Sequence, residues 1–209
     1  MKTTVPLSLL AAGLFVPLFV FRRLGSIDFW WWMSTNIAIL VGLSLIWDES
    51  LWPLLMKDLR GRWAEKIVIG SLSSVVLYLV FLAGNELSHL IPPFASKGIV
   101  EVYSFKHGAS ISRISLLIVL LIGPGEEVFW RGFLQRQWTA KAGTLRGWLG
   151  AASFYAAVHA GSGNIMLVLA ALVCGLYWGA LYARCRSLLL IAVSHTFWDV
   201  LIFLVFPLS

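Results

Sequence analysis

Charged residues are scarce in this chain of 209 residues, because Asp, Glu, Lys and Arg together make up only 12% of it. Soluble domains usually carry about 25%. Hydrophobic residues make up 59%, and the mean hydropathy is +0.86. This apolar surplus exceeds what one soluble core can bury. The composition therefore excludes an ordinary soluble domain and indicates a polytopic membrane protein.

Cysteine is also scarce. The two cysteines, Cys174 and Cys185, lie in or beside one predicted span, and their spacing excludes a disulfide framework or a cysteine metal site. Internal repeats and low-complexity tracts are absent from the sequence. The N-terminal stretch 1–20 lacks a convincing small-residue cleavage site, so we expect a retained first helix rather than a signal peptide.

Acidic residues are outnumbered by basic ones, 10 against 16, which gives a formal net charge of +6. Such an excess can indicate nucleic-acid binding. In a membrane protein it is better explained by basic loops that face anionic lipid and set the topology, so we expect no nucleic-acid partner.

The positions of the basic residues favour an inside N-terminus and an outside C-terminus. The inside then holds Lys2, Lys57, Arg60, Arg62, Lys66, Arg136, Lys141, Arg146, Arg184 and Arg186, and the outside holds Arg22, Arg23, Lys97, Lys106 and Arg113. The pair Arg22 and Arg23 argues for the opposite orientation. The compact chain fits a multi-pass protein of a prokaryotic cytoplasmic (inner) membrane.

Seven apolar segments follow one another, each near the roughly 20 residues that cross about 30 Å of hydrocarbon. They are residues 4–21, 27–47, 67–84, 111–138, 145–162, 164–183 and 187–207. Segments of this length must be helices, because each has to satisfy its own backbone groups. We predict an all-α bundle of about seven transmembrane helices, a single membrane domain built from residues 1–110 and 111–209. Residues 48–66 are expected on the surface and 85–110 in the longest loop.

Few ionisable residues fall inside these segments. The main ones are Glu126, Glu127, Arg131, His159, His195 and Asp199, whereas Asp28 and Arg113 sit near the ends of their segments. A charged group within a bilayer costs several kcal/mol unless it is paired or faces water, so such a cluster indicates a functional site. With a rise of about 1.5 Å per residue, Glu126, His159, His195 and Asp199 fall within about 10 Å of one another along the membrane normal.

The spacing of these residues separates the two glutamates. Glu127 and Arg131 are four residues apart and share a helix face, where they can pair. Glu126 projects about 100° away and is free for another partner. Gly123-Pro124-Gly125 precedes the pair, and a proline within a helix predicts a kink that loosens packing beside Glu126.

The glutamate motif resembles that of the CPBP intramembrane protease family, which includes the CAAX prenyl endopeptidases and many bacterial abortive-infection-type proteins. The first family motif is Glu-Glu-x-x-x-Arg, which matches Glu126-Glu127-Val-Phe-Trp-Arg131.

The second and third family motifs follow in the expected order. The second, Phe-x-x-x-His, is met by His159, with Tyr155 in place of the phenylalanine. The third is His-x-x-x-Asn, or Asp in some members, and is met by His195 and Asp199. The resemblance covers about residues 111–207, and residues before 111 carry no family signature.

The resemblance implies roles for these residues in peptide hydrolysis, which needs an activated water and a stabilised oxyanion. Glu126 would act as the general base, and His159 would hold the same water. His195 and Asp199 would stabilise the tetrahedral intermediate or donate to it. Asp199 donates only when protonated and otherwise orients His195. Glu127 with Arg131 would be structural.

The metal requirement and the substrate are separate questions. Family members have been described both as metalloproteases and as metal-free glutamate proteases. The sequence lacks His-Glu-x-x-His, so we predict no cofactor; the alternative is zinc held by Glu126, His159 and His195.

The expected partners are the lipid bilayer and a membrane-anchored protein substrate, either a prenylated CAAX-type tail or a bacterial membrane-anchored tail.

The resulting hypothesis is an intramembrane endopeptidase that cleaves the C-terminal or membrane-proximal segment of its substrate. Two alternatives from other classes compete with it. One is a non-catalytic membrane scaffold or immunity protein of the same fold. The other is a proton-coupled transporter, because carboxylates at the membrane midplane also serve proton relays.

Overall fold

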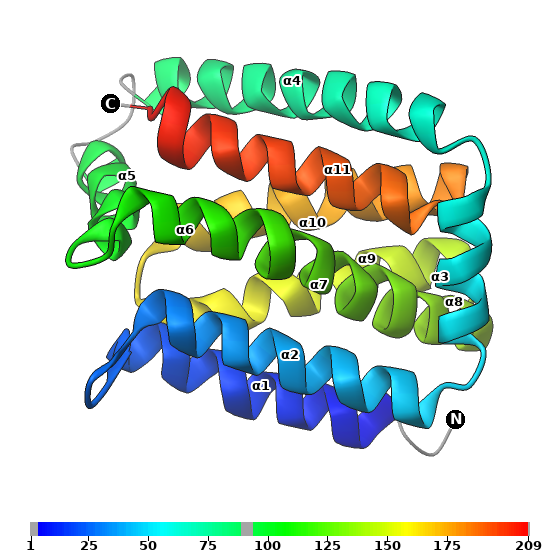
Figure 1. The fold of residues 1–209 in the computed structure, drawn as a ribbon. Helices are drawn as coiled ribbons and strands as arrows, with labels where there is room; N and C mark the ends of the chain where they lie inside the picture. Colours follow the sequence, from blue (N-terminus) through cyan, green and yellow to red (C-terminus); the bar gives the residue numbers. More distant parts are fainter. Residues whose placement is uncertain (1–3, 89–93, 209) are drawn as a thin grey trace.

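The computed structural model describes residues 4–88 and 94–208 and is an all-α bundle, as the sequence predicts (Figure 1). In chain order its elements are α1 (Thr4–Phe21), β1 (Arg23–Leu24), β2 (Ile27–Asp28), α2 (Phe29–Trp47), α3 (Leu51–Arg60), α4 (Trp63–Ser88), α5 (Phe94–Tyr103), η1 (Ser104–Lys106), α6 (Ile111–Leu117), η2 (Ile118–Ile122), α7 (Gly123–Glu127), η3 (Val128–Gln135), α8 (Arg136–Ala142), α9 (Thr144–His159), η4 (Ala160–Ser162), α10 (Ile165–Cys185), α11 (Leu188–Asp199) and η5 (Val200–Val205). The only strand pair of the described residues is the short antiparallel hairpin β1–β2.

The number of spans differs from the prediction of seven. Among the described residues, five helices are long and apolar enough to cross a membrane: α1, α2, α4, α10 and α11 with η5. A sixth span is counted if residues 95–106 and 111–142 form one span, which is bent by 93°. Helix α9 has only 16 residues and is shorter than these spans. The chain is thus an integral, multi-pass membrane protein, but the count of seven is not confirmed.

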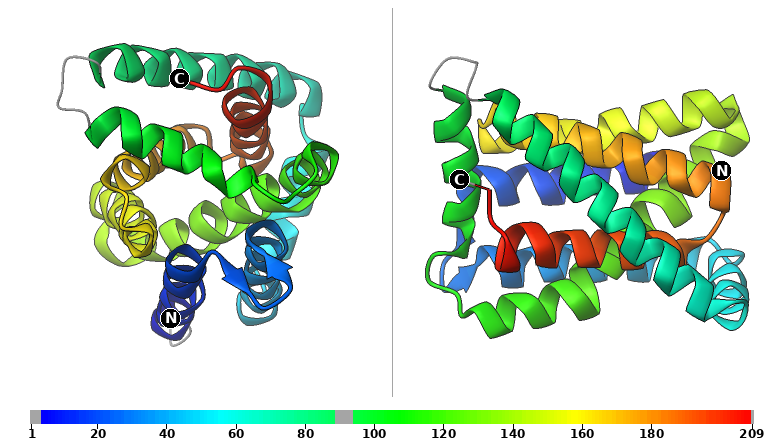
Figure 2. Two further views of the ribbon diagram at one scale, coloured as in Figure 1. Left: turned by 90° about the vertical axis from the view of Figure 1, so that its left-hand side faces the viewer. Right: turned by 90° about the horizontal axis from the view of Figure 1, so that it is seen from above.

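The segment expected as the longest loop, 85–110, is largely helical. Helix α4 continues to Ser88, and α5 and η1 occupy residues 94–106, while residues 89–93 lie outside the described part. Helix α5 runs across one end of the bundle rather than along it (Figures 1 and 2). It therefore closes that end, whereas α3 crosses the opposite end.

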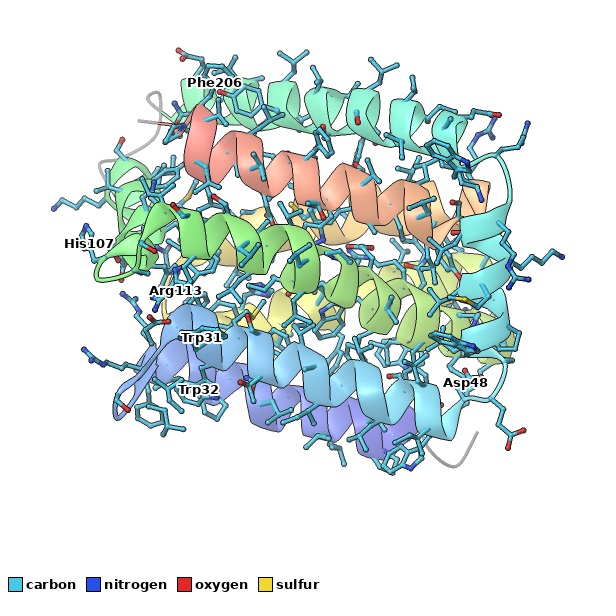
Figure 3. All side chains as sticks on the ribbon, viewed as in Figure 1. Trp31, Trp32, Asp48, His107, Arg113 and Phe206 are labelled. Carbon is cyan, nitrogen blue, oxygen red and sulfur yellow. The ribbon has the colours of Figure 1, made fainter. Side chains whose placement is uncertain are left out.

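The outer surface of the bundle is apolar. Helix α4 packs chiefly against α11 and exposes Val68, Leu72, Val76 and Leu79 on its other side. Charged groups gather at the two ends: Asp48 lies at one end, and His107 and Arg113 lie at the other (Figure 3). An apolar belt between two polar ends is the arrangement that a lipid bilayer requires.

Side-chain caps fix where several helices begin. Asp28 accepts hydrogen bonds from the backbone N–H groups of Trp30 and Trp31 at the start of α2, both at 3.1 Å. Asn164 accepts from Met166 and Leu167 at the start of α10. Each cap satisfies backbone donors that the first helical turn leaves without partners.

The helix that carries the glutamates is interrupted by wider, π-type turns. Two such segments, η2 and η3, flank α7, and a third, η5, follows Asp199. The Gly123 N–H bonds to the Ile118 carbonyl oxygen, five residues back, immediately before Pro124. The wide turn therefore accommodates the proline within a continuous helix. Turns of this kind are rare and occur frequently at functional sites.

Packing at Gly123 and Gly125, which precede Glu126, is tight. A Cβ atom on Gly123 would lie 3.2 Å from the Thr196 Cα atom, and one on Gly125 would collide with the Ile37 side chain. The two glycines thus allow α7 to approach α11 and α2 closely. This contact brings the glutamates to the histidine of α11.

Candidate active site

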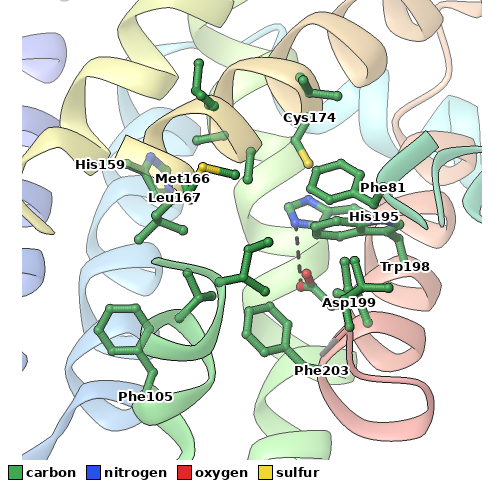
Figure 4. A pocket seen from close by; sticks show the side chains of 18 of the residues that line it. Phe81, Phe105, His159, Met166, Leu167, Cys174, His195, Trp198, Asp199 and Phe203 are labelled. Carbon is green, nitrogen blue, oxygen red and sulfur yellow. Dashed lines mark ion pairs between the residues drawn. The ribbon is translucent and has the colours of Figure 1, made fainter. Parts of the chain in front are cut away.

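A cavity of about 380 Å³ lies inside the bundle, and its wall is mostly aromatic and aliphatic. The ionisable groups of its wall include four of the residues singled out in the sequence: Glu126, His159, His195 and Asp199. Viewed from close by, His159 lies on one side of the cavity, and His195 and Asp199 lie on the other (Figure 4). The cavity thus combines an apolar interior with a few convergent polar groups, as ligand-binding and active sites do.

Glu127 is fully buried, with 0% exposure, and holds two partners through one oxygen. Its Oε1 atom accepts a hydrogen bond from Arg131 Nη1 at 2.8 Å and lies 2.7 Å from His195 Nδ1. The predicted pairing of Glu127 with Arg131 is therefore present. The contact with His195 adds a second function, because a carboxylate that accepts from Nδ1–H directs the other ring nitrogen away from itself.

That other nitrogen, His195 Nε2, faces the remaining carboxyl groups of the site. It lies 3.7 Å from Glu126 Oε2 and 3.5 Å from Asp199 Oδ2. The ring stacks on Trp178, with centroids 3.8 Å apart and planes inclined by 22°. Stacking on one face and a hydrogen bond at Nδ1 together fix the orientation of the imidazole.

Glu126 presents its two oxygens to different surroundings. Oε2 accepts a hydrogen bond from the Tyr155 hydroxyl at 2.8 Å. Oε1 is buried and has no hydrogen-bond partner among the described residues. Glu127 Oε2 likewise has no partner among the described residues, but Glu127 does not line the cavity, so Glu126 is the glutamate placed for chemistry there.

His159 belongs to the cavity but stands apart from this cluster. Its Nδ1 atom lies 2.7 Å from the Tyr155 carbonyl oxygen, one helical turn earlier. The ring packs against Phe19, with centroids 4.5 Å apart. The structure thus brings His195 to 3.7 Å from Glu126 and 3.5 Å from Asp199, and it places His159 across the cavity from His195 and Asp199.

Arg131 is held away from the cavity in the interior of the bundle. Besides Glu127, its guanidinium contacts the carbonyl oxygens of Cys174 and Gly175 at 3.4 and 3.5 Å. Its Cζ atom lies 5.0 Å from the centre of the Tyr155 ring. Arg131 does not line the cavity, which fits the structural role predicted for it.

Two contributors to the site were missed in the sequence. Trp178, which stacks on His195, and the Tyr155 hydroxyl, which donates to Glu126, received no role from the sequence. The signal for Tyr155 was present, because a tyrosine stands where the family motif has phenylalanine. A hydroxyl at that position needed a buried acceptor nearby.

The residues do not gather as a metal site. Over residues 4–88 and 94–208, no group of three or more His, Cys, Asp or Glu side chains is arranged to hold a metal ion. Of the alternative zinc set, Glu126 lies 3.7 Å from His195, whereas His159 lies across the cavity from His195. The absence of a cofactor stays a prediction.

The fold and the site define a multi-pass helical membrane protein with a buried carboxylate and histidine cluster in an apolar cavity. Residues 108–201 match a family described as type II CAAX prenyl endopeptidase Rce1-like. This match confirms the family resemblance seen in the three motifs, and the matched range contains all of them. The family is a protease family, which supports a hydrolase. No curated protein and no solved structure matches the chain significantly.

Proposed function

We propose that the protein is an intramembrane endopeptidase that cleaves the C-terminal or membrane-proximal segment of a protein substrate, using a water molecule activated by Glu126. The observation that carries this proposal is that Glu126, and not Glu127, lines the cavity, with Oε2 held by Tyr155 and with Oε1 lacking a hydrogen-bond partner among the described residues. A carboxylate in this state is suited to accept a proton from water.

In the proposed reaction, Oε1 of Glu126 takes one proton of the water while the hydroxide oxygen bonds to the scissile carbonyl carbon. The carbonyl oxygen then carries negative charge. His195 Nε2–H, when the ring is doubly protonated, or a protonated Asp199 donates a hydrogen bond to it. The C–N bond breaks, and the amine leaves with the proton that Glu126 accepted. His159 helps to hold the water from the opposite wall.

Glu127 and Arg131 support this chemistry without taking part in it. Glu127 fixes His195 through Nδ1, and Arg131 balances the charge of Glu127 in the protein interior. An ion pair buried to this degree is held in place because loss of either partner leaves an uncompensated charge. These two residues therefore act as positioning residues in the proposal.

The position of the cavity mouth supports a substrate that arrives through the membrane. Four residues both line the cavity and are exposed on the outer surface: Val80 and Gly84 on α4, and Leu169 and Val173 on α10. Val80 is 48% exposed and Leu169 is 47% exposed. On each helix the two residues are four apart and share one face. The mouth thus lies between two lipid-facing helices.

The substrate class follows from the family and the cavity together. The matching family is described by its action on CAAX prenyl proteins. An apolar cavity that opens toward lipid suits a tail anchored by a lipid or by a hydrophobic segment. We therefore propose a membrane-anchored protein tail as substrate, with a prenylated CAAX tail and a bacterial membrane-anchored tail as the two candidates.

A comparison of membrane-protein C-termini tests this function. Cells that express the wild-type protein are compared with cells that express Glu126→Gln at the same level, and new C-termini are identified by mass spectrometry. The expected result is a set of truncated tails found only with the wild type. If the two sets of C-termini are identical, the protein is not a protease of this kind.

A further inference from the structure

Tyr155 carries a hydroxyl group at the position where the family motif has a phenylalanine. It lies on α9, lines the cavity and is buried. Its hydroxyl donates to Glu126 Oε2 at 2.8 Å, the usual length of an O–H···O hydrogen bond. A phenylalanine would fill the same space without this donor.

The Tyr155 ring is held firmly, so the hydroxyl has a fixed position. The indole of Trp130 meets the ring edge-on at a centroid distance of 5.1 Å. The Arg131 guanidinium lies 5.0 Å from the ring centre. A donor fixed in this way restrains the carboxylate that it contacts.

The restraint matters because Glu126 has a competing partner. His195 Nε2 lies 3.7 Å from Glu126 Oε2, which is beyond hydrogen-bond distance. A small rotation of the carboxylate would close this gap and form a charge-assisted hydrogen bond. That bond would withdraw the carboxylate from a water molecule and occupy the ring nitrogen that faces the oxyanion.

We infer that Tyr155 is a positioning residue for Glu126: its hydroxyl holds Oε2, keeps the carboxylate apart from His195 and leaves Oε1 directed to the substrate water. The inference rests on the proposed function for its effect on rate. The contact itself does not depend on that function. Chains of this family with phenylalanine at this position would need another restraint on the glutamate.

The first test needs no substrate. The infrared spectra of the purified wild-type protein and of Glu126→Gln are compared, and the band that is lost in the variant is assigned to the Glu126 carboxyl group. In Tyr155→Phe this band is expected to shift, because its oxygen loses a hydrogen-bond donor. Tyr78→Phe is the matched control, since that hydroxyl donates to the Phe206 carbonyl oxygen outside the cavity. An unshifted band in Tyr155→Phe overturns the contact.

The second test measures the consequence for catalysis with a prenylated CAAX-tail reporter peptide. Tyr155→Phe is expected to lower kcat by about tenfold to a hundredfold with KM nearly unchanged, because only the orientation of the base is altered. Tyr78→Phe should retain wild-type kcat. An unchanged kcat in Tyr155→Phe overturns the positioning role.

The outcomes for the two proposals can be told apart. If Glu126→Gln is as active as the wild type, the proposed function fails, whatever Tyr155→Phe does. If Glu126→Gln is inactive and Tyr155→Phe has wild-type kcat, only the role of Tyr155 fails. A rise in KM without a change in kcat in Tyr155→Phe would also contradict the positioning role, because such a result would mean that Tyr155 contributes to substrate binding.

Discussion

Glu127 and His195 are joined by a contact of 2.7 Å between Oε1 and Nδ1, although they are 68 residues apart in the chain. The second glutamate of the motif therefore reaches the third motif directly. The same oxygen accepts from Arg131, so a single buried atom links all three side chains. The two adjacent glutamates consequently differ in function: Glu127 organises the site, and Glu126 faces the cavity.

Separate substitutions of the two glutamates should have unequal effects on stability. Glu127→Gln leaves Arg131 buried without its counter-charge, and breaking a buried pair in this way costs about 3–5 kcal/mol. We expect a clear fall in the thermal unfolding midpoint in detergent. Glu126→Gln leaves the pair of Glu127 with Arg131 in place and removes only the longer contact with His195 at 3.7 Å, so it should unfold closer to the wild-type midpoint.

Equal midpoints for the two variants would contradict this division between the glutamates. A restored midpoint in the double variant Glu127→Gln with Arg131→Met would support it, because that variant removes both buried charges together.

A tryptophan at the cavity mouth should block substrate entry. A side chain at Gly84 would meet nothing within 4 Å of its Cβ atom, so Gly84→Trp is accommodated on α4 and extends across the mouth. We expect kcat/KM on a membrane-anchored substrate to fall at least tenfold with unchanged unfolding.

Gly13→Trp is the matched control for this experiment. Gly13 is also exposed within a helix, and a Cβ atom added to it would meet nothing within 4 Å, but it does not line the cavity. Wild-type activity in Gly84→Trp would show that substrate enters elsewhere.

The charge of Asp48 should stabilise the fold at neutral pH, and this stabilisation should be lost in acid. Burial raises the pKa of Asp48, but hydrogen bonds from Ser50 and Gln137 and the charge of Arg136 outweigh it and lower the pKa below its ordinary value of 3.8. A lowered pKa stabilises the fold above pH 3.8, and this contribution is lost as the pH falls through the value in the folded protein.

Asp48→Asn should accordingly reduce the unfolding midpoint at neutral pH. The difference from the wild type should shrink as the pH drops below 3.8, as thermal unfolding at several pH values will show. A difference that stays constant down to the lowest pH would mean that the Asp48 charge does not stabilise this end of the bundle.

Metal dependence is tested by chelation. We expect peptide cleavage by the purified protein to survive exhaustive dialysis against a chelator, because the acid–base groups of the proposal are all side chains of the chain itself. Loss of activity that one divalent ion restores would replace this prediction with the alternative of zinc held by Glu126, His159 and His195.

Much of the fold followed from the apolar segments. The predicted spans 4–21 and 164–183 agree closely with α1 (Thr4–Phe21) and α10 (Ile165–Cys185). Long apolar runs leave little choice, because a bilayer requires each to satisfy its own backbone. Helix α5 was missed because its ten residues are too few to span a membrane and follow a proline pair.

The site could be predicted only in part. Helical spacing indicated that Glu127 pairs with Arg131, and that pair is present. The contact of Glu127 with His195 depends on how α7 packs against α11, which the glycine at position 123 permits but no periodicity reveals. The Tyr155 hydroxyl bond likewise joins two helices, so spacing along one helix carried no information about it.

The most direct test of the central claim uses purified protein in liposomes with a prenylated CAAX-tail reporter peptide, and identifies the products by mass spectrometry. The account predicts two peptide fragments with a free carboxylate at the cut for the wild type and none for Glu126→Gln that is folded to the same extent. Cleavage at the wild-type rate by Glu126→Gln would contradict it.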